Sequence, residues 1–307
     1  MSAPLMTPNS APLALSTHTL TLADGRRLAW LDYGDPQGMP VLLFHGLPGS
    51  RYQGHPDRSI AAELGIRIIA PDRPGFGRSD YQPGRTHSHW PEDMTALADH
   101  LGLGRFAVLG VSGGGPYAAV CAWKIPQRLL AVGLVSAMGP VAGPEILEGM
   151  PRLNRLFLAL ARRGEWPIHP PARLLSLWAR WWPAHYLETT NAYLPAPDLA
   201  VYARPEVARL MREDLAEALR PGHRGVVREI YLLVRPWDFQ LQEVPLPVHL
   251  WHGEQDATVP LSVARVIAAS LPHCRTTLLP EEGHFLFLNH WREILTTLRR
   301  EASRREL

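Results

Sequence analysis

The sequence lacks the features that mark several large classes of protein. Its 307 residues include only two cysteines, Cys121 and Cys274, which match no metal or redox spacing, so we expect each to be a buried hydrophobe. No run of about 18 uncharged apolar residues occurs. Residues 1–22 have neither the basic start nor the apolar block of a signal peptide. These absences favour a soluble cytoplasmic protein that does not insert into a membrane.

The sequence also lacks any segment dominated by charge of one sign. The 31 basic residues are scattered among 29 acidic ones, giving a formal charge of +2. The chain has no block of about five basic residues, so the sequence shows no footprint for nucleic acid or anionic lipid. Apolar residues make up 46% of the chain, enough for a buried core at this length.

Short continuous apolar runs dominate much of the chain and suit strands buried on both faces of a parallel sheet. They occupy residues 41–44, 66–70, 106–110, 132–136, 248–251 and 276–279. Before them, residues 18–22 and 27–33 flank Ala23-Asp24-Gly25, a turn typical of an antiparallel hairpin. Helical stripes separate most of the runs. This alternation predicts an α/β fold with a mostly parallel, doubly wound sheet of about eight strands.

A different pattern fills the stretch between residues 135 and 248, where helical stripes appear without strand runs. We therefore predict a helical cap over residues 139–236, a core over 17–138 and 237–307, and a loosely ordered tail over 1–16. The stripes are expected to pack as core, including the stripe Leu174, Leu177, Trp178 and Trp181. The Trp-dense stretch that also contains Trp166 and Trp182 suggests the underside of a cap, which would roof a pocket.

The strongest chemical signal is Gly110-Val111-Ser112-Gly113-Gly114, which follows an apolar strand and precedes a helix predicted over residues 116–124. A G-x-S-x-G in this context is typical of a nucleophile elbow, a turn so sharp that only small neighbours avoid clashes. Ser112 is therefore the predicted nucleophile.

A serine hydroxyl needs a base, and the base needs an orienting acid. In elbow enzymes the acid and then the histidine follow the serine, on loops after sheet strands. Asp256 and His284 occupy such positions, in His252-Gly253-Glu254-Gln255-Asp256 and Glu281-Glu282-Gly283-His284. Glu254 and Asp238 stay open as alternatives for the acid, and His273 and His290 for the base.

Acyl transfer also needs two backbone N–H donors for the oxyanion of its transition state. We predict one from Gly113 and one from Leu47, in the loop His45-Gly46-Leu47-Pro48-Gly49-Ser50 that follows an apolar strand. Pro48 has no N–H, which narrows the choice. His45 is expected to brace this loop by hydrogen bonds.

These motifs together resemble the α/β-hydrolase fold superfamily, over about Leu20 to Leu298, with the cap inserted after the sixth strand. Two further segments resemble capped members, namely the acid loop at 252–256 and Pro71-Asp72-Arg73-Pro74-Gly75-Phe76-Gly77-Arg78-Ser79. The resemblance implies that the Asp72 and Arg73 loop is mainly structural. It also implies catalysis without a metal or an organic cofactor.

Departures from particular members narrow the expected chemistry. Epoxide hydrolases and haloalkane dehalogenases carry an aspartate where this chain has Ser112, and proline iminopeptidases usually have a tryptophan where Gly113 stands. We therefore expect a carboxylesterase-like serine hydrolase acting on a small or medium ester with an apolar part.

The same triad could serve C–C or lactone hydrolysis, perhydrolysis, acyl transfer or hydroxynitrile cleavage. A third hypothesis is a ligand-binding or signalling protein. No nucleic-acid partner is expected, and the sequence leaves the oligomeric state open.

Overall fold

The structure is a computed structural model that describes residues 16–140 and 148–306. Apart from Ser16, the predicted tail over residues 1–16 lies outside these ranges, and so does part of the predicted cap, residues 141–147.

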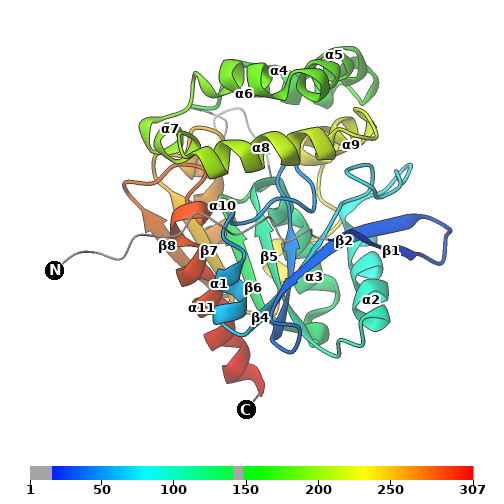
Figure 1. Cartoon of the computed structure of the whole chain (residues 1–307), viewed down its shortest axis with the longest axis vertical. Helices are drawn as coiled ribbons and strands as arrows, with labels where there is room; N and C mark the ends of the chain where they lie inside the picture. The colour runs from blue at the N-terminus through cyan, green and yellow to red at the C-terminus, as the bar shows by residue number, and fades with distance from the viewer. Residues whose placement is uncertain (1–15, 141–147, 307) are drawn as a thin grey trace.

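A single eight-stranded sheet forms the centre of the molecule (Figure 1), in the order β1-β2-β4-β3-β5-β6-β7-β8. The strands are β1 His18–Thr21, β2 Arg27–Gly34, β3 Met39–Phe44, β4 Ile66–Pro71, β5 Phe106–Val111, β6 Leu129–Val135, β7 Val248–Gly253 and β8 Cys274–Leu279. β2 pairs antiparallel with both β1 and β4, and the remaining pairs are parallel. The predicted hairpin and the mostly parallel sheet are confirmed.

Helices cover both faces of the sheet, which explains why the strands are continuously apolar. Along β5, Phe106 and Val108 join one buried cluster, and Ala107 and Leu109 join the other. The first cluster is completed by α2 (Trp90–His100), α3 (Gly115–Lys124) and α10 (Leu261–Ser270). The second is completed by α1 (Ser59–Glu63) and α11 (Phe287–Glu306). Alternate side chains of a strand point to opposite faces, so a strand buried on both sides needs no polar alternation.

In the described part of the segment between β6 and β7, six α-helices lie over one edge of this sheet (Figure 1). The outer helices are α4 (Arg152–Arg162), α5 (His169–Trp181) and α6 (Pro183–Asn191), and the inner helices, nearer the sheet, are α7 (Ala196–Tyr202), α8 (Pro205–Ala218) and α9 (Arg224–Val234). Within the described ranges, no helix is both long enough and apolar enough to cross a bilayer.

The predicted packing of the stripe on α5 was wrong for three of its four residues; the fourth, Trp178, is half-buried against His185 and Tyr186. On α5, Leu174, Leu177 and Trp181 are 70%, 44% and 65% exposed, whereas the core-facing side consists of Ala172, Ser176 and Ala179. The apolar spacing indicated a helix, but spacing alone does not say which side is packed. Small side chains allow α5 to approach α8 and α9 closely, so that side faces inward and the large residues face solvent.

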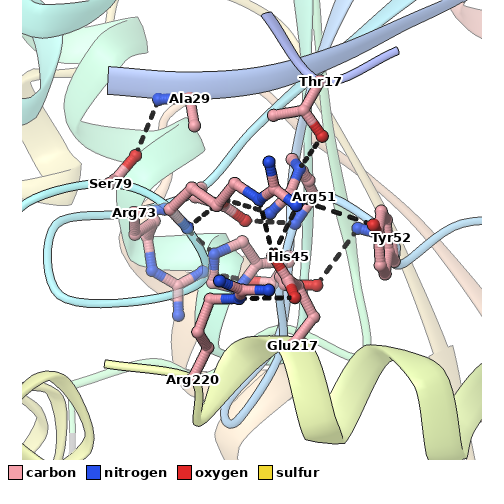
Figure 2. A network of polar contacts seen from close by, with 12 residues as sticks. Thr17, Ala29, His45, Arg51, Tyr52, Arg73, Ser79, Glu217 and Arg220 are labelled. Atoms are coloured by element: carbon pink, nitrogen blue, oxygen red, sulfur yellow. Dashed lines mark hydrogen bonds and ion pairs between the residues drawn. The ribbon is translucent and has the colours of Figure 1, made fainter. Parts of the chain in front are cut away.

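Buried charges connect the inner helices to the core. The guanidinium of Arg51 donates to Asp72 of the loop after β4 at 2.7 Å and to Glu217 of α8 at 2.7 Å. It also reaches Thr17, just before β1, as Figure 2 shows. Asp72 further accepts the backbone N–H groups of Arg51 and Arg78. The loop containing Asp72 therefore acts as a structural junction between the sheet and α8.

A second junction joins α8 to the loop after β3. Asp214 is 3% exposed, and its Oδ1 accepts the Ser50 N–H at 2.8 Å and the Ser50 hydroxyl at 2.6 Å. Burial raises the pKa of Asp214 to about 7, against the effect of these hydrogen bonds. Between about pH 4 and pH 7, the neutral carboxyl is thus favoured in the folded protein but not in the unfolded chain.

This difference predicts a pH-dependent stability. Because the pKa of Asp214 is raised in the folded state, its contribution to the free energy of unfolding is fully present below about pH 4. This contribution is lost as the pH rises through about 7. Asp214→Asn cannot ionise but can still accept from Ser50. From pH 5 to pH 8 the wild type should therefore lose about 3 kcal/mol of unfolding free energy relative to this variant, measured by urea unfolding.

Asp80→Asn is the matched control. Asp80 pairs with Arg27 at the surface, and the hydrogen bond from Arg27 lowers its pKa, so it does not titrate between pH 5 and pH 8. Identical pH dependence of the wild type and Asp214→Asn would contradict the assignment.

Candidate active site

Ser112 lies at a sharp turn between β5 and α3. A single 3-10 turn, Ser112–Gly114, separates the strand from the helix, so the predicted strand–turn–helix context is confirmed. The φ of Ser112 is 52°, in the left-handed region that residues with a Cβ rarely adopt. This backbone conformation is the one expected of a nucleophile elbow.

Glycines make the turn possible because other backbone segments pass very close to it. A Cβ on Gly110 would lie 2.4 Å from the carbonyl oxygen of Gly114. A Cβ on Gly114 would lie 2.1 Å from the carbonyl oxygen of Phe44, at the end of β3. Both distances are far inside van der Waals contact, so the G-x-S-x-G pattern reflects packing around the serine.

The loops after β7 and β8 place Asp256 beside His284. The imidazole Nδ1 lies 2.8 Å from Asp256 Oδ2, and the two residues are 7% and 5% exposed. Asp256 Oδ1 accepts the N–H groups of Thr258 and Val259 at 2.8 Å each, which fixes the carboxylate. The segment after β6 links this pair to the elbow. Ser136 donates its hydroxyl to the His284 carbonyl oxygen. Two residues later, Met138 donates its N–H to the Ser112 carbonyl oxygen.

The electrostatics of His284 involve a residue that the sequence analysis missed. Burial disfavours the charged imidazolium, but the carboxylates of Asp256 and Asp198 outweigh it, so the pKa of His284 lies above its usual value. Asp198 belongs to the inner helix α7 and is 1% exposed. Its Oδ1 accepts the N–H of Phe285 at 2.9 Å. Gly283 leaves room for it, since a Cβ there would lie 2.4 Å from Oδ1.

The alternative acids and bases take other places. Asp238 accepts hydrogen bonds from Ser88. His290 is bonded to Glu282 and Glu293. Glu254 and His273 are exposed. Asp256 and His284 are the predicted pair that the structure brings into contact.

The loop after β3 brings the backbone of Leu47 against Gly113. A Cβ on Gly113 would lie 2.9 Å from the Leu47 Cβ and 3.2 Å from the Leu47 nitrogen. The two predicted oxyanion donors therefore belong to adjacent backbone segments. Both residues line the same pocket as Ser112.

His45 braces this loop. Its Nε2 accepts the Arg73 N–H at 3.0 Å, and its Nδ1 lies 2.9 Å from the Gly46 carbonyl oxygen. Burial lowers the pKa of His45 well below its usual value, and the neighbouring charge of Arg73 adds to this, so the ring is neutral. The Arg73 guanidinium also donates hydrogen bonds to the carbonyl oxygens of His45 and Gly46.

The inner helix α9 supplies the counter-charge for Arg73. Glu229 accepts from Arg73 at 3.3 Å, from Tyr117 of α3 at 2.7 Å, and from Arg85. Burial opposes the charge on Glu229, yet Arg73 and Arg85 outweigh it and lower its pKa to about 2. The loop that contains Leu47 is therefore braced by an ionised group from the inserted helices.

Ser112 opens onto an apolar pocket of about 180 Å³ between the sheet and the inserted helices. Leu47 and Met138 belong to its core side, and Phe157, Leu175 and Ile230 to its helical side. No lining residue among those the structure describes carries a formal charge. The predicted tryptophan roof was wrong, because none of Trp166, Trp178, Trp181 and Trp182 lines the pocket. In the described ranges, no cluster of three or more His, Cys, Asp or Glu could hold a metal ion.

Comparison with known proteins agrees with this architecture. A family model described as the alpha/beta hydrolase fold matches residues 39–290. The chain belongs to this family. It is 28% identical over 275 residues to the dihydrolipoyllysine-residue acetyltransferase component of an acetoin cleaving system from Pseudomonas putida, covering 85% of this chain but only 63% of that relative.

Two further proteins similar to this chain are described as esterases. A bifunctional esterase/perhydrolase of Acinetobacter calcoaceticus is 26% identical over 265 residues, with 82% of this chain and 87% of the relative covered. A thermophilic esterase structure from Thermogutta terrifontis superposes with a TM-score of 0.66 at 25% identity, covering 93% of this chain and 97% of that one. The family and these relatives support hydrolase activity.

The position of Asp198 predicts a measurable effect on His284. Asp198→Asn keeps an oxygen for the Phe285 N–H but removes the negative charge, so the pKa of His284 should fall. An NMR titration of the imidazole, assigned with a His284→Gln variant, measures this without any substrate.

Glu282→Gln is the control, because Glu282 lies in the same loop but pairs with His290. It should leave the His284 titration unchanged. An unaltered pKa in Asp198→Asn would show that Asp198 acts on this loop only through packing.

Proposed function

We propose that the protein is a serine hydrolase that cleaves a small or medium carboxylic ester with an apolar part through an acyl-enzyme. One observation supports it above the others. A serine in the left-handed conformation stands with the backbone of Leu47 and Gly113 at the wall of one apolar pocket. The buried pair of Asp256 and His284 adds the base and its orienting acid.

In the proposed reaction, Ser112 Oγ attacks the ester carbonyl and His284 accepts its proton. The hydrogen bond to Asp256 engages Nδ1, which places the N–H there and leaves Nε2 as the base. The carboxylate of Asp256 stabilises the imidazolium that forms. His284 then returns the proton to the departing alcohol, and water releases the acyl group by the same steps.

The oxyanion of each tetrahedral intermediate would lie between the N–H groups of Gly113 and Leu47. Such donors are effective when they are fixed before the reaction begins. Here His45, Arg73 and Glu229 immobilise the Leu47 loop through buried hydrogen bonds. The rigid loop avoids a reorganisation cost during catalysis.

The pocket supports an uncharged, apolar substrate part. Its described lining is dominated by Leu, Met, Phe, Val and Ile, and its polar groups are neutral. A carboxylate or ammonium bound there would lose its hydration without gaining an ion pair, which is strongly unfavourable. We therefore propose neutral esters as substrates, with the inserted helices acting as a cap that limits their size.

Perhydrolysis is a second candidate, supported by the bifunctional esterase/perhydrolase among the relatives. It would use the same acyl-enzyme, with hydrogen peroxide replacing water as the attacking nucleophile. The choice between the two therefore concerns the second half of the reaction.

A p-nitrophenyl ester series from acetate to palmitate tests the proposal. The wild type should hydrolyse the short and medium esters, and Ser112→Ala should lower kcat/KM by about four orders of magnitude or more. Ser303→Ala, which changes an exposed serine of α11, is the control and should keep full activity.

Adding hydrogen peroxide to the same assay and measuring peracid distinguishes the two candidates. Equal turnover by the wild type and Ser112→Ala would overturn the proposed nucleophile. A wild type that turns over none of the esters would overturn the proposed substrate class.

A further inference from the structure

The outer helices present large hydrophobic side chains to solvent. Of the ten such side chains exposed in the described chain, eight lie between residues 153 and 193. We call the exposed side of α4 to α6, with the loops joining them, the outer face. Its most prominent members are Leu156, Trp166, Leu174, Leu177, Trp181 and Trp182, which are 44% to 77% exposed. Exposed apolar side chains gathered on one part of a fold mark an interaction surface.

The exposure follows from helix geometry. Leu174, Leu177 and Trp181 are spaced i, i+3 and i+7 and therefore lie along one side of α5. The opposite side of α5, with Ala172 and Ala179, is buried against the inner helices. The large residues thus form an apolar strip that is largely exposed to solvent.

The outer face is also strongly cationic. All six arginines of α4, α5 and the loop between them are exposed, and none forms an ion pair with a residue that the structure describes. They are Arg152, Arg155, Arg162, Arg163, Arg173 and Arg180. From residue 152 to the end of α6 there are two acids: Glu165, which forms an ion pair with Arg228 of α9, and Glu188 of α6, which is exposed.

This combination selects among possible occupants. A symmetric contact with a second copy would place six unpaired arginines against six others, which is unfavourable. An anionic bilayer offers phosphate groups to the arginines and an interfacial zone that tryptophan prefers. We propose that the outer face docks on the surface of bilayers rich in anionic lipid.

The sequence alone suggested no footprint for anionic lipid, because no basic block occurs along the chain. Folding changes this, since two successive helices and the loop between them carry six exposed arginines, while Glu165 of that loop is paired with Arg228 of α9. The proposed docking is peripheral: the apolar strip of α5 would lie in the interface, parallel to the bilayer plane.

The pocket adjoins this face. Leu153 of α4 is 42% exposed and also lines the pocket that contains Ser112. If the proposed esterase function holds, an apolar ester could pass from the bilayer into the pocket along α4. That extension rests on the proposed function, whereas the docking itself does not.

Co-sedimentation with vesicles tests the docking on the full chain. The wild type should bind phosphatidylglycerol/phosphatidylcholine vesicles, bind phosphatidylcholine vesicles much more weakly, and lose affinity as salt is raised. Leu174→Ser with Trp181→Ser should lower the affinity at least about tenfold, and so should Arg173→Glu with Arg180→Glu. All four side chains are exposed, so the variants should fold.

The control is Leu278→Ser with Arg300→Glu, which removes an exposed leucine and an exposed arginine outside the inserted helices. It should bind like the wild type. Docking is overturned if the wild type does not bind anionic vesicles, or if the control variant weakens binding as much as the variants of the outer face do. A third result would also overturn docking: the wild type binds no vesicles, and analytical ultracentrifugation finds that it forms a dimer that Trp181→Ser abolishes. Turnover of soluble esters without vesicles tests the proposed function separately.

Discussion

The left-handed backbone at Ser112 is the constraint around which the rest of the site is arranged. It is tolerated because Gly110 and Gly114 let the ends of β3 and β5 and the start of α3 approach within distances that no Cβ permits. The same close packing brings the Leu47 loop against Gly113. The parallel strands β7 and β8 then deliver Asp256 and His284 to the same edge of the sheet.

Acidic side chains from the inner helices hold the loops that surround this turn. Asp214 bonds Ser50, Glu217 bonds Arg51, Glu229 bonds Arg73, and Asp198 bonds the N–H of Phe285. The two ion pairs among them, Arg51–Glu217 and Arg73–Glu229, contribute little net stability because desolvation offsets most of the attraction, but they penalise any other arrangement of the same groups. The inserted helices therefore define the geometry of the site as well as the shape of its pocket.

The sequence was most informative where one local pattern determines the outcome. Continuous apolar runs predicted the strands, and the glycines around Ser112 predicted the turn. Asp198 escaped notice because its role depends on α7 meeting the loop after β8, a contact that no motif in either segment reveals. The stripe at Leu174 was assigned to the core because periodicity gives a helix and an apolar side, but not the partner of that side.

The most direct test of the account is whether Ser112 is a nucleophile activated by His284. A fluorophosphonate reacts with an activated serine without requiring the correct ester, and mass spectrometry of the digested protein identifies the modified residue. The account predicts one adduct, on Ser112, in the wild type and none in His284→Gln. Absence of an adduct, or an equal adduct in both proteins, would contradict it.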